Sequence, residues 1–286
     1  MAEVGPGLRP LRRRVGRALL EPLPDPLRRA AELTGRTRSI AGKRVLVTGA
    51  SSGVGRAAAA LLAEEGAVVL AVARREDELD RLAAETGAHP LPCDLTDPDA
   101  IDALTDDVLA RFGGVDVLVN NAGHSIRRSA EDTVARPYDH DRLMRLNYHA
   151  PVRLTLNLLA SLRENRGQVV NSSTWGVPGG LMPNFTAYHA SKAALSAFAR
   201  SLQAEERAHG VVITSLHFPL MRTPMIAPTE EYAARPALEP HEAAAWVRVA
   251  IRHRPVELAP TYASILDVLG VVSPRLAERM VSAARM

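Results

Sequence analysis

The residues Arg44–Gly55, RVLVTGASSGVG, join a short apolar run to a glycine-rich turn and then to an alanine-rich segment. The run 44–47 predicts a buried strand and residues 54–65 predict a helix. Glycines let the backbone turn sharply and approach a pyrophosphate, while the helix that follows directs unpaired N–H groups at phosphates. A tight turn between a strand and a helix can also be purely structural. Its position between the first strand and the first helix favours a dinucleotide site.

The chain after residue 43 alternates between apolar runs and longer helical segments. The predicted strands are 44–47, 67–73, 88–92, 115–119, 168–171 and 211–217, and the predicted helices are 54–65, 75–86, 98–112, 138–163 and 187–208. The apolar runs are continuous, so the strands should be buried on both faces, as in a parallel sheet covered by helices. We therefore predict a single-domain, Rossmann-type doubly wound α/β fold over residues 41–286. Residues from about 220 to 286 would supply a substrate lid and a terminal helix near 262–286.

The N-terminal 40 residues differ in composition from the rest. They hold nine arginines against four acidic residues, a net charge of +5, so the remaining 246 residues of this +3 chain sum to −2. The body therefore shows no basic stripe for nucleic acid. We predict a basic extension over 1–40, whose residues 8–20 either form a short amphipathic helix on an anionic membrane surface, pack on the body, or act as a solvated linker.

Several classes of protein are disfavoured by what the chain lacks. No uninterrupted apolar run of about 18 residues appears, and Cys93 is the only cysteine, which excludes an internal disulfide and favours a reducing, cytoplasmic setting. The histidines show no metal-ligand spacing. His124, His189 and His217 fall near the predicted crevice, where pocket lining or core hydrogen bonding is expected rather than a metal site.

The end of the second predicted strand selects the dinucleotide. A carboxylate there would bind the adenosine ribose and favour NAD(H), but the sequence is Val72-Ala73-Arg74-Arg75, with no acid before Glu76. The guanidinium of Arg74 suits a 2′-phosphate, which predicts NADP(H). Asp94, after the third strand, would accept from the adenine amino group or cap the next helix. Asn120–Gly123, after the fourth strand, lets the backbone run close to the cofactor.

Tyr188 and Lys192 lie four residues apart in a helical segment and therefore share one face. A phenol needs a nearby cation to act as an acid–base group at neutral pH, and the ammonium of Lys192 would lower its pKa. Lys43 and Lys192 are the only lysines among 35 basic residues, so a compact ammonium is indicated at this position. Taken alone, the pair would also fit two side chains on the surface of a helix that have no functional role.

Two further polar groups complete the predicted site. The segment Val169–Thr174 ends the fifth strand, where a hydroxyl can bind a substrate oxygen as charge shifts onto it. Asn147, on the preceding helix, would hold a water molecule that links Lys192 to solvent, or would simply bond to the helix backbone.

Together these residues resemble the short-chain dehydrogenase/reductase family over about residues 42–260. The TGxxxGxG loop (Thr48–Gly55), the NNAG segment, the serine after strand five and the Tyr188-xxx-Lys192 pair occur in family order. The resemblance implies a catalytic set of Asn147, Ser173, Tyr188 and Lys192, hydride transfer between nicotinamide C4 and a carbonyl or alcohol carbon, and a homodimer or homotetramer built on the two long helices. The cofactor contacts that it implies are Gly49, Ser51, Ser52, Gly53, Val54, Gly55, Arg74, Asp94, Leu95, Asn121, Ala122, Gly123, Tyr188, Lys192, Pro219, Leu220 and Thr223.

Three stretches look most like the actinobacterial branch that contains fatty acyl-CoA and fatty-aldehyde reductases. They are NNAGHSIRRS (120–129), AYHASKAALSAF (187–198) and PLMRTPMIAPT (219–229). This likeness implies a long, lipophilic carbonyl or alcohol substrate. Apolar residues near 221–226 and the terminal helix would then cover the substrate, or serve core packing or a subunit contact.

The sequence departs from the family pattern at two places. The tyrosine follows Ser173 by 15 residues, whereas family members usually show about 13, so Ser172 and Thr174 remain alternatives to Ser173. Pro219-Leu220 stands where many members have Pro-Gly, with Thr223 nearby. Three functional hypotheses are carried forward: an NADP(H)-dependent oxidoreductase, a nucleotide sensor without chemistry, and a membrane-recruited partner protein that acts through its arginine-rich extension.

Overall fold

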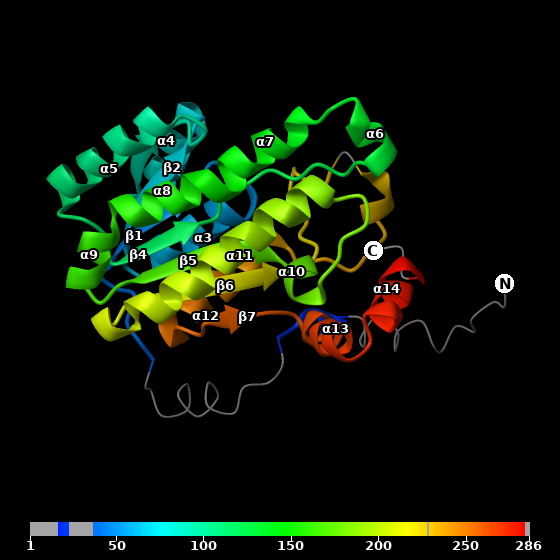
Figure 1. The fold of residues 1–286 in the computed structure, drawn as a ribbon. Coiled ribbons are helices and arrows are strands. Elements are labelled where there is room, and N and C mark those ends of the chain that lie inside the picture. Colours follow the sequence, from blue (N-terminus) through cyan, green and yellow to red (C-terminus); the bar gives the residue numbers. More distant parts are fainter. Residues whose placement is uncertain (1–16, 23–36, 228, 284–286) are drawn as a thin grey trace, which may run out of the picture.

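A computed structural model describes residues 17–22, 37–227 and 229–283, and its centre is a seven-stranded, fully parallel sheet (Figure 1). The strand order is β3-β2-β1-β4-β5-β6-β7. The strands are β1 (Arg44–Thr48), β2 (Val68–Ala73), β3 (His89–Pro92), β4 (Val117–Asn120), β5 (Gln168–Thr174), β6 (Val212–Phe218) and β7 (Glu257–Leu258). The order reverses direction between β1 and β4, which is where such sheets open a crevice for ligands. The predicted doubly wound parallel sheet is confirmed, and β7 is an addition to it.

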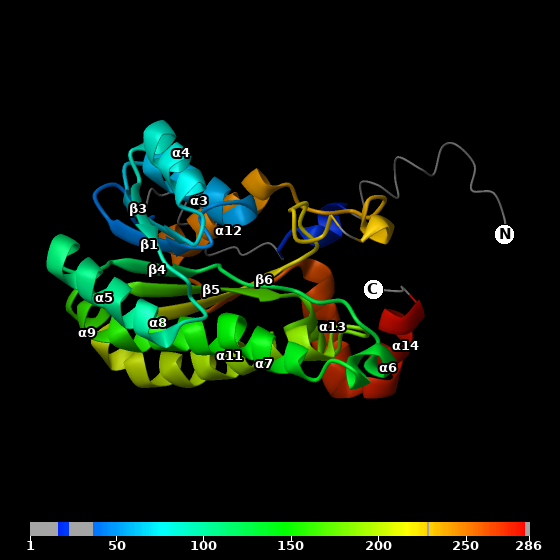
Figure 2. The same ribbon diagram turned by 90° about the horizontal axis from the view of Figure 1, so that it is seen from above.

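Helices cover both faces of the sheet (Figure 2). One face carries α3 (Gly53–Glu64), α4 (Glu76–Thr86) and α12 (Pro240–His253), and the other carries α5 (Pro98–Phe112), α8 (Ala150–Asn157), α9 (Leu159–Glu164) and α11 (Thr186–Glu206). Side chains of each strand alternate between the two cores: Val45 and Val47 pack under α3 and α12, while Leu46 packs under α5 and α8. Burial on both faces explains why the strands are continuously apolar.

Two predicted helices are interrupted. The segment predicted as one helix over 138–163 consists of α7 (Tyr138–Met144), a π-helical turn η1 (Arg145–His149), α8 and α9. The terminal helix predicted near 262–286 consists of α13 (Thr261–Val272) and α14 (Pro274–Ala283), because Pro274 cannot donate a backbone hydrogen bond and begins a new helix. The shorter elements α6 (Ala130–Val134), α10 (Gly176–Gly179), η2 (Arg207–His209) and η3 (Glu230–Tyr232) were not predicted, nor was α12.

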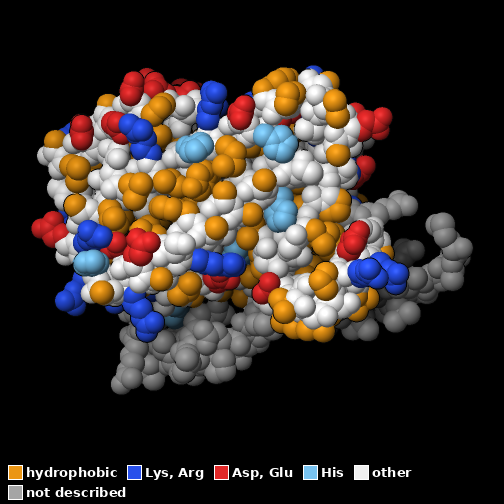
Figure 3. Space-filling view, viewed as in Figure 1, with side chains coloured by type: hydrophobic (Ala, Val, Ile, Leu, Met, Phe, Trp, Pro, Cys, Tyr) orange, Lys and Arg blue, Asp and Glu red, His pale blue; other side chains and the backbone are white. Residues whose placement is uncertain are grey.

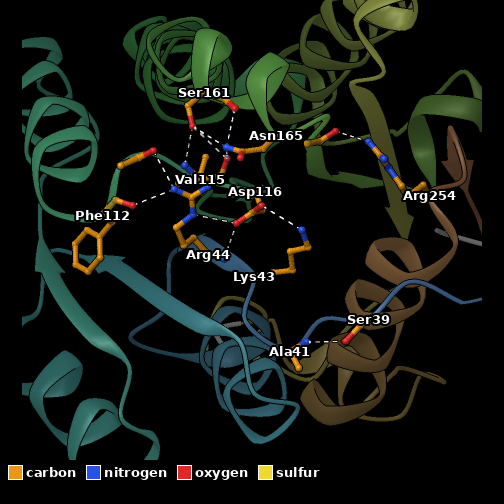
Figure 4. A network of polar contacts seen from close by, with 12 residues as sticks. Ser39, Ala41, Lys43, Arg44, Phe112, Val115, Asp116, Ser161, Asn165 and Arg254 are labelled. Atoms are coloured by element: carbon orange, nitrogen blue, oxygen red, sulfur yellow. Dashed lines mark hydrogen bonds and ion pairs between the residues drawn. The ribbon is translucent and has the colours of Figure 1, made fainter.

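A polar cluster at the amino edge of the sheet fixes where β1 and β4 begin (Figure 4). The Asp116 carboxylate accepts from the backbone N–H of Arg44 at 2.9 Å, from its Nε at 3.0 Å and from Lys43 Nζ at 3.3 Å. Burial alone would raise the pKa of Asp116, but the Arg44 donors hold it below its usual value. The Arg44 guanidinium also donates to the Phe112 carbonyl at the end of α5. The two central strands therefore start in a fixed register.

The described parts of the N-terminal extension lie against the body. Leu20 and Ile40 are buried in the core under α12, and Arg17 forms an ion pair with Glu242 of that helix. The Glu21 carbonyl accepts from the backbone N–H of Thr261 at 2.9 Å. Most of the predicted amphipathic segment, residues 8–16, lies outside the described residues. Among the helices that the structure describes, none combines the length and the hydropathy needed to cross a bilayer.

Candidate active site

A cavity of about 460 Å³ opens at the carboxyl edge of the sheet, where the strand order reverses. Most residues predicted for the cofactor and for catalysis line it. The lining residues are Gly49, Ser51–Val54, Ala73–Arg75, Cys93–Thr96, Asn121–His124, Arg142, Leu146, Ser172, Ser173, Tyr188, Lys192, Phe218, Met221 and Thr223–Met225. The structure thus brings the turn after β1, the ends of β2 to β6 and the start of α11 to one place.

The glycine-rich turn has the shape that its sequence predicts. Gly49 and Gly53 have φ of +70° and +55°, which favour glycine. A Cβ atom at Gly55 would lie 2.2 Å from the Gly49 carbonyl oxygen and 2.5 Å from Asn121 Nδ2, so α3 can pack this close only without a side chain there. Gly55 therefore shapes the turn from behind instead of lining the cavity. Ser52 begins α3 without a side-chain cap, which leaves first-turn N–H groups available to an anion.

Thr48, which sequence reasoning treated only as part of the turn, holds the two central loops together. Its Oγ1 accepts from the backbone N–H groups of Asn121 and Ala122, each at 2.9 Å, and donates to the Val119 carbonyl at 3.2 Å. Asn121 Nδ2 donates to the Thr48 carbonyl at 2.9 Å. The NNAG loop is therefore fixed against β1, with Ala122 and Gly123 at the cavity wall.

At the end of β2, Arg74 lines the cavity, is exposed, and forms no hydrogen bond or ion pair with any residue that the structure describes. Its neighbour Arg75, missed by the sequence reasoning, donates to Ser51 Oγ at 3.0 Å and so adds a second guanidinium beside the glycine turn. Asp94 accepts from Thr96 rather than capping α5, whose N-cap is Asp97. The hydrogen bond from the Thr96 backbone lowers the pKa of Asp94.

Tyr188 and Lys192 lie in the first two turns of α11 and both face the cavity, as their spacing predicts. Lys192 is buried, and its Nζ donates to the Ser172 carbonyl at 2.7 Å. Burial raises the pKa of Tyr188 to about 12 and lowers the pKa of Lys192 to about 8. The expectation that the ammonium makes this phenol acidic is wrong for the protein alone. Burial is the larger cause of the shift in the phenol pKa, and the Thr174 side chain, which lowers it, is the smaller one.

The hydroxyls that end β5 point in two directions. Successive strand side chains alternate between faces, so the Ser173 side chain lies on the opposite face from those of Ser172 and Thr174. Its Oγ lies 3.3 Å from Ser196 Oγ, although Ser173 also lines the cavity. Thr174 points to the other side, where its Oγ1 lies 3.7 Å from Met182 Sδ and where its side chain lowers the pKa of Tyr188. Ser172 Oγ lies 3.5 Å from Asn121 Oδ1. Of the three hydroxyls that the sequence left open, Thr174 is the one beside the phenol.

Asn147 is fully buried in the π-helical turn η1, a kind of turn that is frequent at functional sites. Its Oδ1 accepts from the His124 N–H, and its Nδ2 donates to the His124 carbonyl and to Ser191 Oγ, each at 2.9 Å. It is therefore bonded to the backbone of the loop after β4 and not to that of its own helix, and the water molecule predicted beside it stays a prediction. A Cβ at Gly123 would lie 3.2 Å from Asn147 Oδ1 and 3.4 Å from Lys192 Nζ. Asn147 is therefore close to the lysine without lining the cavity.

The segment after β6 contributes less than predicted. Pro219 is buried and does not line the cavity, and the Leu220 carbonyl is used by the Leu238 N–H at 2.9 Å. Thr223 does line it, together with Met221 and Met225. Of the later elements, α12 packs under the sheet against α3, and no described residue after Met225 lines the cavity. Closure of residues 221–225 over a substrate stays a prediction.

Apolar side chains continue from the phenol toward the C-terminal helices. Trp175, which follows Thr174, packs against Leu266 of α13 and stacks obliquely on Tyr262, with ring centroids 5.7 Å apart. Leu181 and Met182 complete this cluster. Among the described residues, no group of three or more His, Cys, Asp or Glu side chains has the geometry to hold a metal ion.

Comparison with known proteins agrees with this geometry. The family model for short chain dehydrogenase matches residues 43–233. The chain belongs to the short-chain dehydrogenase family. It is 48% identical over 242 residues to a fatty acyl-CoA reductase of Mycobacterium tuberculosis and 44% identical over 242 residues to the fatty acyl-CoA reductase of Acinetobacter baylyi, in each case across 82% of both chains.

A solved structure gives the same result. The 3-ketoacyl-(acyl-carrier-protein) reductase of Brucella melitensis, in complex with NADH, superposes with a TM-score of 0.69 at 27% identity, over 76% of this chain and 93% of that one. The predicted family and fold are confirmed, and this short-chain dehydrogenase is an oxidoreductase. The predicted roles of single site residues stay predictions.

We expect Gly55→Ala to destabilise the protein by about 1–3 kcal/mol, because overpacking must push α3 away from β1 and Asn121. Gly270→Ala is the matched control, since Gly270 also lies inside a helix, α13, but a Cβ there meets nothing within 4 Å. It should leave stability unchanged or raise it by up to about 1 kcal/mol. Urea unfolding of both variants measures the difference, and equal midpoints would contradict the close approach at Gly55.

Proposed function

We propose that this enzyme is an NADP(H)-dependent oxidoreductase that transfers a hydride between nicotinamide and the carbonyl or alcohol carbon of a lipophilic substrate. The observation that carries the proposal is the grouping of Tyr188 and Lys192 at one wall of a cavity whose other end is the glycine turn. The nicotinamide, when bound, supplies or accepts the hydride. The protein supplies the proton, the alignment of the carbonyl and the exclusion of water.

The residues fit a dinucleotide. Positive φ at Gly49 and Gly53 and the uncapped start of α3 form a cradle for a pyrophosphate. The free guanidinium of Arg74, with Arg75 beside it, suits a 2′-phosphate at the end of β2 and favours NADP(H) over NAD(H). Lys192 would hold the ribose hydroxyls.

At the Tyr188 end of the cavity, we assign one role to each polar group. Tyr188, protonated because of its raised pKa, donates its proton to the carbonyl oxygen during reduction. Thr174 replaces Ser173 as the hydroxyl that orients the carbonyl, since it is the one that contacts the phenol. Lys192 receives its orientation from the Ser172 carbonyl, and Asn147 keeps the His124 loop beside it.

The substrate class rests on the apolar side of the site and on the relatives. Trp175, Met182 and Tyr262 form an apolar wall beyond Thr174, and two relatives are named fatty acyl-CoA reductases. A fatty acyl, aldehyde or ketone substrate would place its chain along this wall. The predicted homodimer or homotetramer, formed through the long helices, also stays a proposal.

The test of the proposed function is NADPH oxidation against aldehydes, ketones and acyl thioesters of graded chain length. We expect kcat/KM to rise with length, by at most roughly fourfold per methylene. Tyr188→Phe should lower kcat by about 10²- to 10⁴-fold while NADPH still binds, measured by quenching of protein fluorescence. Wild-type protein that binds NADPH but turns over none of these compounds would support the sensor hypothesis instead.

A second experiment separates the two adjacent hydroxyls. Thr174→Ala should lower kcat by about 10²- to 10³-fold, as the loss of a donor to the reacting oxygen does in other enzymes, and Thr174→Ser should restore most of it. Ser173→Ala is the matched control and should stay within about threefold of wild type, because its hydroxyl contacts Ser196. A larger loss in Ser173→Ala than in Thr174→Ala would return the role to Ser173.

Cofactor choice is tested at Arg74. Arg74→Ala should raise the KM for NADPH roughly tenfold, because one charge-assisted bond to a phosphate is lost, and should change the KM for NADH by less than about twofold. Arg81→Ala, an exposed arginine on α4 paired with Glu78, controls for surface charge. Equal effects of Arg74→Ala on both cofactors would remove the argument for a 2′-phosphate site.

A further inference from the structure

The side chains that line the active-site cavity carry an excess of positive charge. Four of them are cationic, Arg74, Arg75, Arg142 and Lys192, and Asp94 is the one carboxylate among the lining residues. Figure 3 shows no comparable concentration on the face over α8 and α11, where apolar and uncharged side chains fill the middle and basic and acidic ones mix at the margin. The cavity therefore attracts anions more strongly than this outer face does.

Arg142 is the cation of this set that the proposed function leaves without a role. In that function the glycine turn takes a pyrophosphate, Arg74 and its neighbour Arg75 take a 2′-phosphate, and Lys192 takes the ribose. Arg142 lines the same cavity, is exposed, and forms no hydrogen bond or ion pair with any residue that the structure describes. An unpaired guanidinium in a cavity is suited to a phosphate, because its fork can donate two parallel hydrogen bonds to it.

Arg142 approaches the cavity from the side opposite to the glycine turn. It lies on α7, one helical turn before Leu146 of η1, and both side chains line the cavity. Figure 2 shows α7 beside α11 on one face of the sheet, whereas α3, which follows the glycine turn, lies on the other face. A phosphate bound by Arg142 would therefore be held on a wall of its own.

His124 lines the cavity within electrostatic reach of two of these arginines. Burial lowers its pKa, the charge of Arg142 and then that of Arg74 lower it further, and Asp139 acts in the opposite direction. The Asp139 carboxylate is itself paired with Arg128 at 3.1 Å. An anion bound between His124 and Arg142 would replace their repulsion with attraction, and a ring N–H of the histidine would be a second donor to it.

We propose that Arg142 and His124 form a phosphate subsite on the α7 side of the cavity, apart from the glycine turn and from Arg74. The phosphate has two possible sources, the pyrophosphate of the dinucleotide and a phosphorylated carrier on the substrate, as in a thioester of coenzyme A. Both present anionic phosphate oxygens to the same donors. The subsite rests on the proposed function for the assignment of the other phosphates.

Calorimetric titration of the full-length protein, without turnover, tests the subsite. The probes are NADPH, NADH and coenzyme A, the last with pantetheine as its counterpart without phosphate. Arg142→Gln should weaken binding of the probe that supplies the phosphate by roughly tenfold or more, because a charge-assisted hydrogen bond is lost. Arg145→Gln is the matched control, since Arg145 is also exposed, three residues further along, but does not line this cavity. It should change binding by less than about twofold.

The four probes separate the two sources. A loss for NADPH and NADH alike would assign the phosphate to the pyrophosphate, and a loss for coenzyme A that pantetheine does not share would assign it to the substrate carrier. A loss for NADPH alone would place Arg142 at the 2′-phosphate and overturn the separate subsite, as would unchanged binding of every probe or equal losses in Arg145→Gln. Wild-type protein that binds neither dinucleotide would contradict the proposed function, and coenzyme A would then decide the subsite.

The pKa of His124, followed by NMR titration of its ring, gives a second measurement that does not depend on affinity. Arg142→Gln should raise this pKa in the protein without ligand, because a nearby positive charge is removed. The probe that loses affinity in Arg142→Gln should raise it in the wild type, because the bound phosphate favours the protonated ring. A His124 pKa that stays the same on binding of that probe would overturn the role of the histidine.

Discussion

The site depends on how closely the first turn of α3 approaches the carboxyl ends of β1 and β4. Thr48 can bond both N–H groups of the loop after β4 only because that loop lies directly against β1. Gly55 makes this possible, since any side chain there would occupy the space of the Gly49 carbonyl and of Asn121. The cavity begins where this contact ends. A shift of α3 would therefore move the anion-binding turn and the Asn121–Gly123 wall together.

At the other end of the cavity, desolvation sets the protonation of the reacting groups. Burial raises the pKa of Tyr188 to about 12 and lowers that of Lys192 to about 8, so both shifts favour the neutral forms. A phenol that keeps its proton is suited to donating it to a carbonyl oxygen. Thr174 lowers the phenol pKa, but burial outweighs it and the pKa stays raised.

The sequence predicted correctly the features that depend on one local pattern, such as strands and helix faces. It did not predict which hydroxyl of β5 lies beside the phenol, because that depends on the register of the strand as well as on the motif. Continuous apolar runs identified six of the seven strands, and the spacing of Tyr188 and Lys192 placed both on one side of α11. Ser173 was chosen by likeness to a motif, but strand alternation decides which hydroxyl faces the phenol. That alternation becomes informative only when the register of β5 is known, and here it separates Ser173 from Ser172 and Thr174. The break at Pro274 had a clear signal that was overlooked.

The use of lysine at position 192, in a chain that otherwise carries arginine, follows from the space and burial at that point. Its Nζ donates to the Ser172 carbonyl at 2.7 Å and lies close to Gly123. Arginine would also keep its charge in this buried position, whereas the lysine pKa near 8 lets the group change charge close to neutral pH. The only other lysine, Lys43, is half-exposed and pairs with Asp116 at the opposite edge of the sheet. The rarity of lysine was therefore a usable signal for position 192. It was not sufficient alone, since only the helical spacing from Tyr188 distinguishes Lys192 from Lys43.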